Sequence, residues 1–276
     1  MQRYIKNIIF DFDDTLCQTQ KYGYNLENYV AGQMGYKKMP LKLHISTWGK
    51  PLPEVADTRF PGINVEKFMN EVGKTMAEFT KLGKFDVISE KTINTLKSLK
   101  KLGYRLFILT SRTKKESSHL MKRDYILSEF INNKDFYYKE KTQYGKPDPR
   151  VFKNLLKNNN ILAKECVYIG DSPSDSLAAK FAGMSFICSL ESGLRKRESF
   201  LNDLVDAYIK DISELLNVID NLTTSHKVNI IQYKEKVKFI ISVAKQRISV
   251  PHDYFSTRLP EIKQLIDVLL KSNKVK

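Results

Sequence analysis

Four short apolar runs, each ending in polar residues, alternate with helical patterns along the first two thirds of the chain. Their length and their aromatic or β-branched content predict buried strands. The runs are "NIIFDFDDT" (7–15), "YRLFILTSR" (104–112), "CVYIGDSPSD" (166–175) and "MSFICSLES" (184–192). The stretch 89–103 between two of them has apolar residues at helical spacing and ends in glycine. This alternation predicts an α/β fold, with a parallel sheet covered by helices.

Residues 17–85 have a different pattern, with helical periodicity and a loop rich in Pro and Gly over 47–62, but no convincing strand. This block lies between the first and second predicted strands and begins directly after the acidic residues that end the first strand. We therefore expect residues 1–16 and 86–215 to form the α/β core and residues 17–85 to form a helical cap over the strand ends.

The strand pattern stops near residue 215, and 228–247 and 260–270 have amphipathic helical spacing. Residues 216–276 are thus predicted to form a basic helical extension, with 11 Lys and Arg against 4 Asp and Glu from residue 226 onward. Packing of these helices on the core or on a second subunit is the favoured interpretation. The alternative is that their basic face binds an anionic polymer such as nucleic acid.

Composition narrows the class of protein. The formal net charge of +15 over 276 residues is compatible with anionic partners, but a solvated lysine-rich surface is the favoured explanation. No segment approaches the run of about 18 apolar residues that a membrane span needs, and the N-terminus does not resemble a secretory signal. We expect a cytoplasmic protein without a membrane partner. Its three cysteines, Cys17, Cys166 and Cys188, are expected to be reduced and structural.

Polar side chains that could carry chemistry follow three of the predicted strands. In an open parallel sheet the carboxyl ends of the strands meet at one edge, where ligands bind. Asp11 and Asp13 are two residues apart, and together with Asp171 they would repel one another unless a cation relieved the repulsion. A hard divalent cation with oxygen ligands suits such a cluster, so we predict Mg²⁺.

With this charge balanced, Asp11 is a plausible nucleophile toward a phosphate, and Asp13 a plausible general acid and base. Asp14 is expected to point away to solvent. Turn and helix-cap chemistry is the simpler alternative for these acidic residues taken alone.

Four segments resemble, in order, the motifs of the haloacid dehalogenase (HAD) superfamily. "DFDDTL" resembles the first motif, "FILTSR" the second, "GKPDPRVF" the third and "GDSPSDSLAAKFAGM" the fourth. The resemblance covers about residues 5 to 215. It implies a Rossmann-type core and a phosphatase or phosphotransferase that uses Mg²⁺.

Carried over by position, the resemblance makes Asp11 the nucleophile and a metal ligand. Asp13 becomes the general acid and base, and it binds the metal through its backbone carbonyl. Asp171 would bind the metal directly, while Asp175 would support it through a water molecule or through Lys146.

The same resemblance assigns the phosphate contacts. Thr110 would hold a phosphoryl oxygen, and Lys146 would neutralise the nucleophile and the phosphate. Ser111 and Arg112 are expected to help hold the phosphate or to line the mouth of the site, although Arg112 could equally be a surface residue. These roles meet the needs of phosphoryl transfer, where positioning and charge neutralisation dominate.

The position of the insert resembles the helical cap of the phosphoglycolate phosphatase and β-phosphoglucomutase branch, which closes over the site and contacts the leaving group. Lys50 is the preferred candidate for recognising the substrate, and His44, Trp48 and Arg59 are further candidates. Each could instead be an ordinary packing or surface residue of the cap.

Together these observations predict a Mg²⁺-dependent phosphatase, a monomer or homodimer, that hydrolyses a small phosphorylated metabolite through an aspartyl-phosphate. A phosphomutase of the β-phosphoglucomutase type is the nearest alternative, because it shares the core chemistry. From a different class, a non-catalytic protein could use the basic surface to bind nucleic acid or a protein partner.

Overall fold

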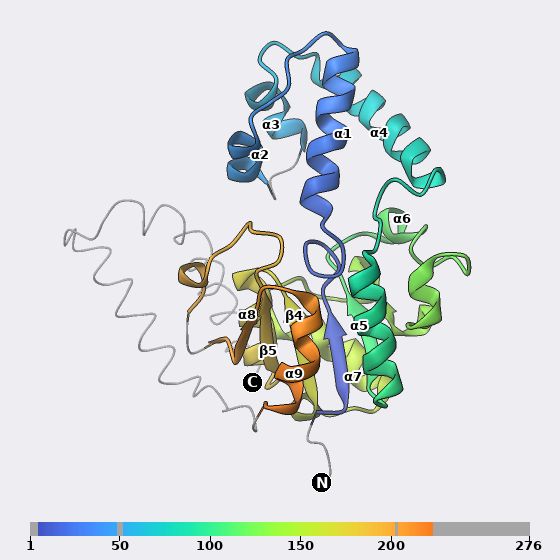
Figure 1. The fold of residues 1–276 in the computed structure, drawn as a ribbon, viewed down its shortest axis with the longest axis vertical. Coiled ribbons are helices and arrows are strands. Elements are labelled where there is room, and N and C mark those ends of the chain that lie inside the picture. The colour runs from blue at the N-terminus through green and yellow to red at the C-terminus, as the bar shows by residue number, and fades with distance from the viewer. Residues whose placement is uncertain (1–4, 49–51, 202–203, 223–276) are drawn as a thin grey trace, which may run out of the picture.

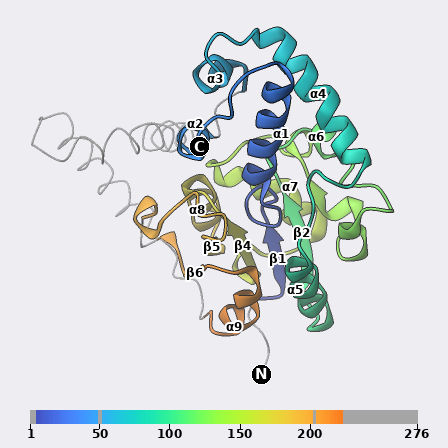
Figure 2. The same ribbon diagram turned by 45° about the horizontal axis from the view of Figure 1, so that its top comes forward.

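The computed structural model describes residues 5–48, 52–201 and 204–222 (Figure 1). The predicted substrate contact Lys50 and the basic segment 226–276 lie outside these described residues. Figures 1 and 2 show a helical unit standing over an α/β core.

The core is built on one six-stranded sheet in the order β3-β2-β1-β4-β5-β6, in which every neighbouring pair is parallel. The strands are β1 (Asn7–Phe10), β2 (Arg105–Leu109), β3 (Phe136–Tyr137), β4 (Cys166–Gly170), β5 (Ser185–Ser189) and β6 (Ala207–Ile209). The predicted α/β fold with a parallel sheet is confirmed. Central strand β1 is buried along its whole length, as a strand with helices on both faces must be.

Alternate residues of the strands supply two separate cores. Ile8 and Phe10 of β1 pack in one hydrophobic cluster with Leu96 of α5, whereas Ile9 packs in a second cluster with Ala178 of α8. Successive strand residues point to opposite faces of a sheet, which explains this division. The helices of the core are α5 (Glu90–Lys101), α6 (Lys114–Ser117), α7 (Lys153–Asn159), α8 (Pro173–Phe181) and α9 (Leu215–Asp220).

The predicted boundary between the core and the C-terminal extension differs from the structure. Helix α9 begins at Leu215, and its Leu215 and Ile219 are buried in the core cluster that contains α5. The core therefore continues at least to residue 220, and an extension starting at 216 would divide this helix.

Four helices form the unit above the sheet: α1 (Thr19–Gln33), α2 (Leu41–Thr47), α3 (Leu52–Arg59) and α4 (Val65–Lys81). They enclose a small core of their own, in which Leu26, Phe60 and Phe68 are buried. Asn64 caps α4 by accepting a hydrogen bond from the Lys67 backbone N–H. The segment 47–62, predicted as a loop, contains α3. The unit stands beyond the carboxyl end of β1, the edge of the sheet at which we expect ligands (Figure 1).

Within the described ranges, no helix is both long and apolar enough to cross a membrane.

Candidate active site

Asp11 directly follows β1, and its backbone N–H donates to the Ile169 carbonyl at 2.8 Å, which ties it to the end of β4. The residue is 6% exposed. Burial raises the pKa of Asp11 to about 7, although the positive charge of Lys146 opposes the shift. A carboxylate in this position needs further positive charge to stay ionised.

Lys146 supplies part of that charge and joins two acidic residues. Its Nζ lies 3.1 Å from Asp11 Oδ1 and 2.6 Å from Asp175 Oδ1, and the side chain is almost fully buried. Burial opposes the charge on Lys146, but its two carboxylate neighbours hold the pKa well above its ordinary value. Lys146 Nζ also donates to the Tyr168 hydroxyl at 3.2 Å, which in turn donates to Asp175 at the same distance.

Asp175 is fixed by the local structure at the start of α8. Ser172 is the N-cap of this helix, and its backbone N–H and hydroxyl both donate to Asp175 Oδ2, at 3.0 and 2.6 Å. A Cβ atom on Gly170 would stand only 2.7 Å from Asp175 Cγ. The absence of a side chain at Gly170 therefore allows Asp175 to approach the end of β4.

Three buried carboxylates, those of Asp11, Asp171 and Asp175, offer oxygen atoms that all lie within 4.8 Å of one another. Among the described residues no hydrogen bond or ion pair reaches the Asp171 carboxylate, and burial together with Asp175 and Asp11 raises its pKa well above the ordinary value. A hard divalent cation such as Mg²⁺ fits this set, because it takes oxygen ligands and would balance the charge that Lys146 leaves uncompensated.

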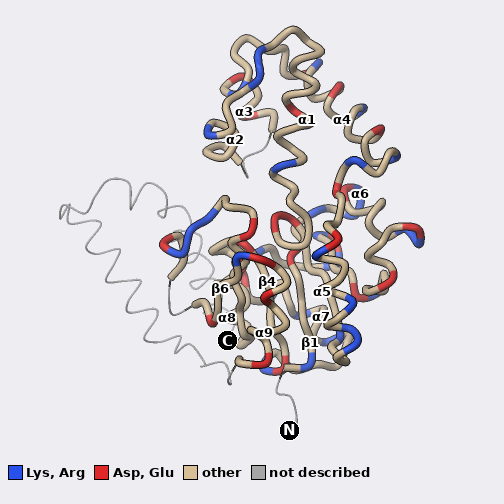
Figure 3. Tube along the Cα trace, in the orientation of Figure 1, with Lys and Arg blue, Asp and Glu red and all other residues tan. Residues whose placement is uncertain are grey.

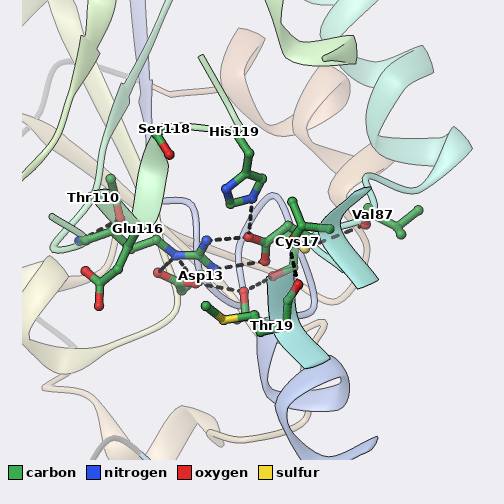
Figure 4. A network of polar contacts seen from close by, with 12 residues as sticks. Asp13, Cys17, Thr19, Val87, Thr110, Glu116, Ser118 and His119 are labelled. Carbon is green, nitrogen blue, oxygen red and sulfur yellow. Dashed lines mark hydrogen bonds and ion pairs between the residues drawn. The ribbon is translucent and has the colours of Figure 1, made fainter. Parts of the chain in front are cut away.

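The side chain of Asp13 points into a different set of contacts, drawn in Figure 4. Thr19 Oγ1 donates to Asp13 Oδ1 at 2.8 Å, and the Arg112 guanidinium donates to both oxygens, with Nη2 at 2.6 Å from Oδ1. The side chain of Arg112 is only 12% exposed, which excludes the alternative that Arg112 is a surface residue. The general acid and base predicted at Asp13 is thus held by an arginine.

Thr110 follows β2 and is buried, and its hydroxyl accepts a hydrogen bond from the Arg112 backbone N–H at 3.2 Å. Ser111 is exposed. Both line a cavity of about 530 Å³ that also includes Lys146. Three of the predicted phosphate contacts therefore line one cavity, and one of them, Lys146, also contacts Asp11.

The prediction that Asp14 points to solvent is wrong. Asp14 is 3% exposed, and its carboxylate accepts hydrogen bonds from the Gln20 backbone N–H at 2.9 Å and from Trp48 Nε1 at 3.0 Å. A left-handed backbone at Asp14, with φ of 55°, turns the side chain toward the cap. Asp14 thus links the loop that carries Asp11 to the cap.

Two of the proposed substrate contacts in the cap are packing residues. His44 is fully buried, and Arg59 is paired with Glu27 through Nη1 at distances of 2.8 and 2.6 Å. Trp48 packs against Gly23 and His44 while it donates to Asp14. None of these three side chains is free to bind a substrate in this arrangement.

The sequence reasoning missed Asp86, His119 and Tyr168. Asp86 and His119 belong to no motif. Asp86 contacts both Arg112 and His119, and these contacts depend on the return of the chain from the cap. Tyr168 gave a usable signal, because a tyrosine in a fully buried strand needs a partner for its hydroxyl.

Along the chain, acidic positions gather where the sheet meets α1 (Figure 3).

Comparison with known proteins agrees with this arrangement. Residues 8–189 match the family model of the haloacid dehalogenase-like hydrolases. The pyrophosphatase PpaX of Bacillus velezensis is 30% identical over 64% of this chain and 79% of its own length. The glyceraldehyde 3-phosphate phosphatase of Methanocaldococcus jannaschii is 28% identical, over 79% of this chain and 98% of that protein.

Among solved structures, a HAD-superfamily hydrolase of subfamily IA from Geobacter sulfurreducens has the same fold. Its TM-score is 0.62 at 18% identity, covering 79% of this chain and 97% of that one. The fold and the site together define a class of protein: an α/β hydrolase whose acidic site lies beneath a helical cap. The chain belongs to the haloacid dehalogenase-like hydrolase family. The predicted family and the prediction of an enzyme are confirmed.

Proposed function

We propose that this hydrolase cleaves a small phosphomonoester with the aid of Mg²⁺, through a phosphorylated Asp11. The enzyme class, a phosphoric monoester hydrolase, follows from the family and from curated relatives that are phosphatases. The observation that carries the mechanism is the position of Asp11, which lies at the end of β1, 3.1 Å from Lys146 and within a cluster of carboxylates.

In the first step an oxygen of Asp11 attacks the phosphorus and the bond to the leaving oxygen breaks. Asp13 donates a proton to that oxygen. In the second step Asp13 takes a proton from water as the water attacks the phosphorus, and the bond to Asp11 breaks. Throughout, Lys146 balances charge on Asp11 and on the phosphoryl oxygens, and Thr110 donates its hydroxyl to one of them.

Asp11, Asp171 and the backbone carbonyl of Asp13 would hold Mg²⁺, and Asp175 would support the site through Lys146. When bound, the ion supplies positive charge that keeps Asp11 ionised and lets an anionic phosphate approach it. The predicted partner is accordingly a small phosphorylated metabolite. The cytoplasmic location and the monomeric or dimeric state stay predictions.

The test is phosphate release from a panel of sugar phosphates, phosphoglycolate and nucleotides, with and without Mg²⁺. We expect Mg²⁺-dependent release by the wild type. In Asp11→Asn the rate of Mg²⁺-dependent phosphate release should fall by a factor of about 10⁴ or more, because the amide is not a nucleophile.

An isomeric sugar phosphate in place of free phosphate would indicate the phosphomutase alternative. A folded wild type that binds Mg²⁺ but releases no phosphate from any compound would contradict the proposal and favour a binding protein.

A further inference from the structure

Arg112 lies between two carboxylates and holds both. On one side its Nε and Nη2 donate to Asp13, at distances between 2.6 and 3.1 Å. On the other side Nη1 and Nη2 donate to Asp86, at 2.5 and 2.9 Å. The guanidinium carbon is also 4.7 Å from the centre of the Phe12 ring. A planar guanidinium engaged in this way on two edges and one face has little freedom to rotate.

Asp86 is the second anchor of this arginine, and it is fully buried. His119 Nε2 lies 2.9 Å from Asp86 Oδ2, and the Tyr125 hydroxyl donates to the Asp86 carbonyl oxygen. Burial alone would raise the pKa of Asp86, but the hydrogen bonds from His119 and Arg112 outweigh burial and lower it. Asp86 therefore carries a negative charge at neutral pH, and it lies on the segment between α4 of the cap and α5 of the core.

We propose that Arg112 is a positioning residue for Asp13, and that Asp86 and His119 hold Arg112 in the orientation which does this. The inference rests on the proposed function, in which Asp13 gives a proton to the leaving oxygen. A general acid works only within hydrogen-bond reach of the atom it protonates, so its orientation determines its contribution. Without the second carboxylate, Arg112 would rotate and Asp13 would lose its fixed partner.

Asp86→Asn is the variant that separates this role from folding. Asparagine keeps the shape of the side chain and tolerates the left-handed backbone at this position, where φ is 54°. Asp206→Asn is the matched control, since Asp206 forms an ion pair with the buried Lys180 at 2.7 Å, away from the site. His119→Ala is a second, milder variant, because His119 is 18% exposed at its side chain.

The decisive comparison uses two substrates with different leaving groups, both with saturating Mg²⁺. Glycerol 3-phosphate has a poor leaving group that needs protonation, whereas p-nitrophenyl phosphate releases a stable anion that does not. We expect Asp86→Asn to lower kcat/KM for glycerol 3-phosphate at least tenfold more than for p-nitrophenyl phosphate. His119→Ala should shift the ratio of kcat/KM for the two substrates in the same direction, and Asp206→Asn should leave this ratio unchanged. Equal losses for both substrates, or no loss, would overturn the proposal.

A second measurement does not depend on turnover. The Nε–H signal of Arg112, assigned in ¹⁵N NMR spectra through its absence in Arg112→Lys, should exchange slowly with water in the wild type and in Asp206→Asn. It should exchange at least tenfold faster in Asp86→Asn. Unchanged protection there would contradict the anchoring role. A wild type inactive toward both esters would contradict the proposed function instead, and the exchange rates would still decide the role of Asp86.

Discussion

Lys146 and Asp175 form the rigid part of the site at the scale of single residues. Lys146 bridges Asp11 and Asp175 in a buried setting, where removal of one member leaves an uncompensated charge. Asp175 has three further contacts, to the backbone and hydroxyl of Ser172 and to Tyr168. The position of Asp175 therefore sets that of Lys146, and through Lys146 that of Asp11.

Gly170→Ala tests this chain of contacts. A Cβ atom there would overlap Asp175, so we expect the variant to lose about 1–3 kcal/mol of unfolding free energy. Displacing Asp175 should also lower kcat by about 100-fold, because Lys146 would move with it. Urea unfolding and steady-state kinetics measure the two effects.

Gly73→Ala is the control, since a Cβ there meets nothing within 4 Å in the interior of α4. The free energy of unfolding of Gly73→Ala should rise by about 0.5–1 kcal/mol, and the variant should keep full activity. If Gly170→Ala behaved like this control, the close approach at β4 would have no role.

At the scale of elements, the cap is held together by a buried polar cluster. Arg59 of α3 pairs with Glu27 of α1 and donates to Thr47 of α2 at 2.9 Å, while His44 of α2 lies against the Gln20 carbonyl. Burial, and then the positive charge of Arg59, lowers the pKa of His44 to about 4. His44 is thus neutral in the folded protein at neutral pH.

This shift predicts a pH dependence of stability. An unfolded chain takes up a proton at His44 near pH 6.5, whereas the folded protein does so only near pH 4. The contribution of His44 to the free energy of unfolding should therefore fall as the pH drops from 6.5 toward 4, by up to about 1.4 kcal/mol per pH unit, whereas Asp11, with its raised pKa, contributes in the opposite direction. Urea unfolding between pH 7.5 and 5 measures it.

His44→Gln keeps a hydrogen-bond donor without titrating, so its free energy of unfolding should fall less than that of the wild type as the pH drops from 6.5 toward 4. If the free energy of unfolding had the same pH slope in the two proteins, His44 would take up its proton equally in the folded and unfolded states, which would contradict this account.

At the scale of the whole molecule, the sequence predicted the parallel core and the inserted helices because long apolar runs and helical periodicity mark them. It missed β3 and β6, which have two and three residues and leave no periodic signal. It misjudged Asp14, whose direction depends on a left-handed backbone and on a tryptophan 34 residues away.

The residues of the candidate site also fall into two groups, those that the sequence predicted and those that it did not. Asp11 and Asp171 meet at the carboxyl edge of the sheet, as their place after the strands indicated. Lys146 and Asp175, which only the family resemblance assigned to the site, lie beside them. Asp86 and His119 could not be found from spacing, because Asp86 meets Arg112 and His119 only when the chain returns from the cap. Short-range patterns predict elements, whereas contacts between distant loops require the folded chain.

The central claim is that Asp11 becomes phosphorylated, and chemical trapping tests it most directly. The wild type is mixed with a phosphomonoester that it hydrolyses, with Mg²⁺ present, then quenched in acid and reduced with borohydride, which converts an acyl phosphate into an alcohol. Peptide mass spectrometry should find homoserine at position 11, only when substrate and Mg²⁺ are both present. Turnover without modification at Asp11, or with modification at Asp13 instead, would contradict the account.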